Sequence, residues 1–163
     1  MSSEVIALLE SQHDRIEELL DRIPREMGSV RAQAFLELRR LLAVHEAVER
    51  QLVHSKAKDE DAGAPDSRMH EEDEAAALLT TLEALDVEST EFETKFRGLR
   101  DAVLQHAEAE ELTEFGELDG DFSDADADRI RAAVEQVESG VDAMEIPYAQ
   151  MQERARAALR TSG

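Results

Sequence analysis

The chain has 163 residues, and its 39 Asp and Glu against 18 Lys and Arg give a formal net charge of −21 at pH 7. It contains no cysteine, which excludes disulfides, thiolate nucleophiles, iron–sulfur clusters and cysteine-ligated haem or zinc. The negative charge argues against nucleic acid and anionic membranes as partners, because few basic side chains are available to release counterions from phosphates.

Helix is the only secondary structure that the sequence predicts over long windows, because Ala, Leu, Glu and Arg dominate and alternating β-branched runs are absent. Pro24, the acidic segment 59–65, the turn-like segment 116–123 and Gly140 separate the helices. Asp66 or Ser67 is expected to cap the third helix, and Thr90 with Glu93 has the pattern of a capping box. The expected helices cover residues 3–23, 29–56, 67–86, 90–116, 124–138 and 147–160.

Each of the first four helices carries a histidine followed four residues later by a glutamate. This spacing places both side chains on one helical face. Imidazole and carboxylate ligands in this mixture are what a di-iron or di-manganese centre needs. The four pairs are His13/Glu17, His45/Glu49, His70/Glu74 and His106/Glu110.

The apolar stripes indicate which of these residues face the interior of the bundle. On the first helix, His13 lies on the stripe that Leu9 and Ile16 define, whereas Glu17 lies about 100° round the helix and is expected to face solvent. The stripes of the second and fourth helices run through His45 and Glu49 and through His106 and Glu110. Because a buried carboxylate without a partner is costly, these two glutamates are expected to bind a cation.

The third helix leaves more rotational freedom, because Leu78, Leu82 and Leu85 follow mostly at spacings of four. His70 and Glu74 are both predicted as ligands there. The two halves of the chain repeat this pattern, so we expect an all-α, up-down-up-down four-helix bundle with two metals at its centre. Residues 1–116 would form this bundle, and residues 117–163 a helical extension packed on it or a partner surface.

These residues resemble the hemerythrin family in its broad form, the HHE cation-binding domain, over about residues 3–116. The resemblance implies an oxo- or hydroxo-bridged pair of non-haem iron ions, although manganese or zinc remains compatible with the same atoms. It also implies that Glu49 and Glu110 bridge the metals and that the histidines are terminal ligands. The implied metal ligands are His13, His45, Glu49, His70, Glu74, His106 and Glu110.

Two departures from oxygen-carrying hemerythrins bear on function. Glu74 stands where those proteins have a second histidine, and Glu110 follows His106 by four residues where their aspartate follows by five. Added carboxylate should stabilise ferric over ferrous iron. The resemblance therefore favours reaction with a small oxidant such as O2 or H2O2, with catalase-like peroxide decomposition as the leading activity.

Two alternatives stay open: non-catalytic binding of O2 or NO, or iron sensing, and a purely structural bundle with satisfied core histidines. His54 is interpreted as a surface or outer-sphere residue, and Glu46 and Glu111 as outer-sphere or solvent residues. Tyr148 is expected to pack on the bundle or, alternatively, to reach the metal pocket. Without a basic leader or a long apolar run, the chain is expected to be soluble and cytoplasmic. It is expected to be a monomer or a weak homodimer.

Overall fold

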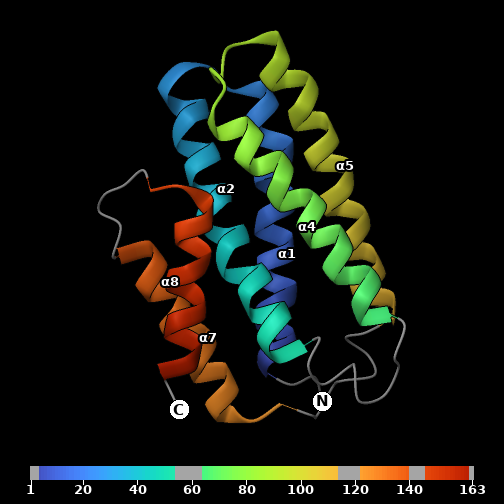
Figure 1. Cartoon of the computed structure of the whole chain (residues 1–163), viewed down its shortest axis with the longest axis vertical. Coiled ribbons are helices and arrows are strands. Elements are labelled where there is room, and N and C mark those ends of the chain that lie inside the picture. The colour runs from blue at the N-terminus through green and yellow to red at the C-terminus, as the bar shows by residue number, and fades with distance from the viewer. Residues whose placement is uncertain (1–3, 54–63, 114–121, 140–145, 162–163) are drawn as a thin grey trace.

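The computed structural model describes residues 4–53, 64–113, 122–139 and 146–161, and within these ranges the chain is helical with no strand (Figure 1). The all-α fold predicted from the sequence is therefore confirmed. The elements are α1 (Glu4–Arg22), the 3₁₀ turn η1 (Ile23–Arg25), α2 (Gly28–Val48), the π-helical turn η2 (Glu49–Val53), α4 (Ala64–Glu83), α5 (Thr90–Thr113), α7 (Asp124–Ser139) and α8 (Tyr148–Thr161).

The helices α1, α2, α4 and α5 form a bundle in which each helix runs opposite to the one before it (Figure 1). The pairs α1/α2 and α4/α5 pack as hairpins, and α1 also contacts α5. Buried Leu, Ile and Phe side chains of all four helices fill the interior. One part of this core consists of packed aromatic rings, those of Phe35, Phe92 and Phe96. The ring centroids of Phe35 and Phe92 lie 5.2 Å apart.

The C-terminal helices cover the outer side of α2. Helix α8 packs against α2 and α4, and α7 packs against α1, α2 and α8 (Figure 1). Tyr148 and Met151 of α8 belong to the same hydrophobic core as the bundle. None of the described helices is both long and apolar enough to cross a membrane.

Local signals set the helix boundaries with small differences from the sequence prediction. Helix α4 begins at Ala64 rather than at Asp66 or Ser67, and Pro65 fits its first turn, where no backbone N–H is needed. The hydroxyl of Ser89 accepts a hydrogen bond from the backbone N–H of Phe92. Ser89 is thus the N-cap of α5, and the capping box expected from Thr90 is not formed.

Candidate metal centre

Five buried polar side chains from four helices meet inside the bundle, and each is at most 9% exposed. Helix α1 contributes one imidazole, α2 and the adjoining η2 contribute an imidazole and a carboxylate, α4 contributes a carboxylate, and α5 contributes an imidazole. They are His13, His45, Glu49, Glu72 and His106.

The first cluster consists of His13, His45 and Glu49. The Nε2 atoms of the two histidines lie 2.9 Å apart. The Oε1 atom of Glu49 contacts Nε2 of His45 and lies 3.8 Å from Nε2 of His13. Two imidazole nitrogens and a carboxylate oxygen therefore converge on one small volume, as the ligands of a cation do.

The second cluster consists of Glu49, Glu72 and His106. Here the other oxygen of Glu49, Oε2, lies 2.9 Å from Nε2 of His106, which in turn lies 3.5 Å from Oε1 of Glu72. In each cluster the potential ligand atoms all lie within 4.8 Å of one another. Glu49 thus belongs to both clusters and offers one oxygen to each, which is the arrangement of a carboxylate that bridges two metal ions.

The protonation states of the first cluster suit a cation. Burial lowers the pKa of His45 and so favours the neutral imidazole. Burial alone would raise the pKa of Glu49, but its interactions with the surrounding imidazoles, first of all His45, lower that pKa well below its usual value. A neutral imidazole with a free lone pair and an ionised carboxylate are the forms that bind metals.

Gln12 and Arg50 orient two of these side chains. Nδ1 of His45 lies 2.8 Å from Oε1 of Gln12, which can accept its N–H, so Gln12 holds the ring with Nε2 turned toward His13 and Glu49. Nε of Arg50 donates to Oε2 of Glu72 at 3.1 Å, which leaves the other oxygen of Glu72 facing His106. Arg50 and Glu49 lie in the π-helical turn η2, a distortion often found at functional sites.

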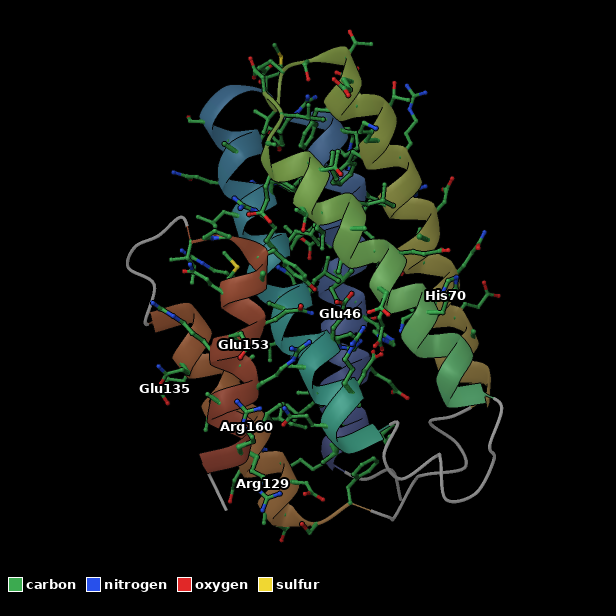
Figure 2. The ribbon with its side chains drawn as sticks, viewed as in Figure 1. Glu46, His70, Arg129, Glu135, Glu153 and Arg160 are labelled. Atoms are coloured by element: carbon green, nitrogen blue, oxygen red, sulfur yellow. The ribbon has the colours of Figure 1, made fainter. Side chains whose placement is uncertain are left out.

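A cavity of about 270 Å³ adjoins the clusters, with a lining that includes His13, His45, Glu72 and His106. Glu46 also lines this cavity, and Figure 2 shows it inside the bundle. Burial raises the pKa of Glu46 to about 8. A space of this size can hold several water molecules or a small ligand such as O2 or H2O2.

The structure brings together four of the residues that the sequence predicted as ligands, namely His13, His45, Glu49 and His106. It does not bring His70 and Glu74 to the clusters. Their side chains are 74% and 62% exposed and pair with each other at 3.1 Å. Figure 2 shows His70 on the outside of α4. The side chains of Glu110 and Glu111 and all of His54 lie outside the part that the structure describes. Glu17, expected to face solvent, is exposed beside the cavity.

The sequence pattern does not identify Glu72, because the His70/Glu74 motif predicts the opposite face of α4 to be buried. The buried stripe of α4 runs through Glu72, Ala75, Leu79 and Leu82. His70 and Glu74 lie two residues before and after Glu72, a rotation of about 200°, and so face the opposite side. Counting back from Leu82 in alternating steps of three and four would have identified Glu72.

The sequence pattern does not indicate Gln12, and it predicts Glu46 to be either an outer-sphere or a solvent residue, whereas the structure buries Glu46 at the cavity. Gln12 lies next to His13 on the flank of the buried stripe of α1 and carries no motif of its own. Glu46 lies about 100° round α2 from its neighbour His45, on the side of α2 against which α8 packs. Helix α8 covers that position, and the spacing pattern of the first four helices could not indicate this.

Comparison with known families identifies the family of the bundle. A family model described as the hemerythrin HHE cation binding domain matches residues 4–118, well over half of the chain. No match was found among curated proteins or among solved structures. The matched range contains α1, α2, α4 and α5 and every residue of the two clusters, and it ends before α7 and α8.

Proposed function

Because the chain belongs to the hemerythrin HHE cation-binding family, we propose that it holds a pair of iron ions and reacts with a small oxidant, with decomposition of hydrogen peroxide as its activity. The position of Glu49 carries this proposal. Its two oxygens face two separate groups of buried nitrogen and oxygen ligands, which supports a two-metal rather than a one-metal site. Manganese and zinc fit the same ligand types.

The residues of the two clusters would be ligands of different ions. His13 and His45 would hold one ion, Glu72 and His106 the other, and Glu49 both, while Glu110 stays a predicted ligand. Bound iron would supply electron exchange with the oxidant. The carboxylates Glu49 and Glu72 favour the more highly charged oxidation state, and the volume of the cavity limits its occupants to small molecules.

Metal analysis combined with a peroxide assay tests this function. Protein expressed with iron should contain iron and evolve O2 from hydrogen peroxide, and His106→Ala should lose part of the iron and most of the peroxide activity. Glu153→Gln, on the exposed face of α8, is the control and should behave as wild type. Peroxide turnover at the wild-type rate in His106→Ala, or in protein stripped of metal, would contradict the proposal.

A second candidate function is sensing of iron or of a diatomic ligand without turnover. One specific observation favours it: a buried chain of hydrogen bonds runs from the cavity to helix α8. A stable ligand-bound optical spectrum of the reduced protein, without consumption of O2 or peroxide, would support sensing over catalysis.

A further inference from the structure

Glu46 joins the cavity to helix α8 through buried hydrogen bonds. The Tyr148 hydroxyl donates to Oε2 of Glu46 at 2.5 Å, and the amide of Gln152 donates to the same oxygen at 3.1 Å. The three side chains are 4%, 1% and 9% exposed for Glu46, Tyr148 and Gln152. The carboxyl group is thus held by two donors, both from α8.

Packing alone does not explain this cluster. Glu46 lies near the carboxyl groups of Glu49 and Glu72, whose negative charge disfavours a further carboxylate there. A buried polar group that needs partners stabilises a fold no better than an apolar side chain of similar size. A carboxyl group at this position therefore points to a role in the cavity that it lines.

The backbone of Tyr148 also fixes the first turn of helix α8. The backbone N–H of Tyr148 donates to both oxygens of Glu83 on α4, each at 3.1 Å. Arg39 of α2 in turn donates to Glu83 at 3.1 Å. Tyr148 therefore contacts α4 through its backbone and α2 through its hydroxyl, so the position of Glu46 depends on the docking of α8.

We propose that Glu46 is part of the metal centre and that Tyr148 and Gln152 are its positioning residues, so that metal binding and the docking of α8 are thermodynamically coupled. This inference rests on the proposed metal site. A cation in the cavity attracts the Glu46 carboxyl group that α8 holds in place, so loss of either donor weakens metal binding. By reciprocity, metal binding stabilises α8 on the bundle.

Cobalt(II) titration of chelator-treated protein tests the first half of the coupling. Tyr148→Phe keeps the ring but removes the donor, and it should weaken cobalt affinity about fivefold or more and change the cobalt absorption spectrum. Gln152→Leu should act in the same direction. Glu153→Gln, exposed on the same helix, is the matched control and should leave both unchanged.

Amide hydrogen exchange of the wild-type protein tests the second half without any variant. Exchange in residues 148–161 should slow when cobalt binds. Unchanged cobalt affinity in both variants together with unchanged exchange of α8 would overturn the coupling and leave the metal site standing. Absence of cobalt binding by the wild-type protein would overturn the metal site, and the coupling with it.

Discussion

Glu49 is fully buried among three imidazoles, and both clusters depend on it. Substitution Glu49→Gln keeps its size but removes the negative charge and one acceptor oxygen. We expect this variant to lose metal from both positions, whereas His13→Ala removes a ligand of the first cluster alone and should keep part of the metal. Metal content per chain, measured after identical loading, distinguishes the two variants, and equal losses would argue against a shared carboxylate.

The face that α4 turns inward can be tested with a matched pair of substitutions. Glu72 is buried in the second cluster, whereas His70 on the same helix is exposed. Glu72→Gln should reduce the metal content, and His70→Ala should leave it unchanged. The reverse result would show that α4 presents its other face, with His70 and Glu74, to the metals in the loaded protein.

The buried Glu46 makes the stability of the metal-free protein depend on pH. Its pKa rises from an ordinary value of 4.5 to about 8 because burial disfavours the carboxylate. Between these pH values the folded state binds more protons than the unfolded state. The contribution of Glu46 to the free energy of unfolding is therefore complete below pH 4.5 and is lost as the pH rises to about 8. The loss amounts to at most about 1.4 kcal/mol per pH unit.

Urea unfolding of chelator-treated protein at several pH values measures this effect. The difference between wild type and Glu46→Gln isolates it, because other titrating groups are common to both proteins. Relative to Glu46→Gln, the wild type should lose stability from pH 5 to pH 8. A constant difference across this range would show that Glu46 ionises normally.

At the level of whole helices, hydrophobic periodicity was enough to predict the fold. Among the residues that the structure describes, six helices with nearly correct ends follow from stripes spaced by three and four residues and from breaks at Pro24 and Gly140. On α1, α2 and α5 the same stripes also placed His13, His45, Glu49 and His106 in the interior. These helices have long, regular apolar stripes, so their rotation about the helix axis is well determined.

The site was less predictable where that rotation was ambiguous or where contacts are distant in sequence. Helix α4 offers Leu78 and Leu79 in succession, so two registers fit the pattern, and the motif His70/Glu74 favoured the register that the structure does not show. The contact between Glu46 and Tyr148 joins residues more than one hundred positions apart. Local periodicity carries no information about which distant helix covers a given face.

The start of α5 gives a test of local stability. Ser89 accepts a hydrogen bond from the backbone N–H of Phe92, whereas Thr90 is the first helical residue. Ser89→Ala should lower the free energy of unfolding by about 1 kcal/mol. Thr90→Ala should change it much less, and thermal or urea unfolding of the two variants compares them. A larger effect of Thr90→Ala would place the cap at residue 90, as the sequence pattern had suggested.

At the scale of the whole molecule, we expect the negative charge to select the ligands that can approach the cavity. The chain carries a net charge of −21, and the lining of the cavity includes exposed acids, among them Asp14, Glu17 and Glu108. Such a field repels anions and attracts cations, but it exerts no net force on a neutral molecule. O2, NO and H2O2 are neutral at pH 7, which makes them better suited to this site than an anionic oxidant.

Salt dependence of ligand binding tests this selection. Raising the ionic strength from about 0.01 to 0.15 M shortens the Debye length from about 30 to 8 Å and screens the repulsion. The association rate of azide, an anionic probe, with the iron-loaded protein should therefore increase with added NaCl, whereas the rate of reaction with hydrogen peroxide should stay constant. Stopped-flow absorption measures both rates. An azide rate that falls with salt would mean that the bound metal charge, rather than the acidic surface, dominates the field at the cavity.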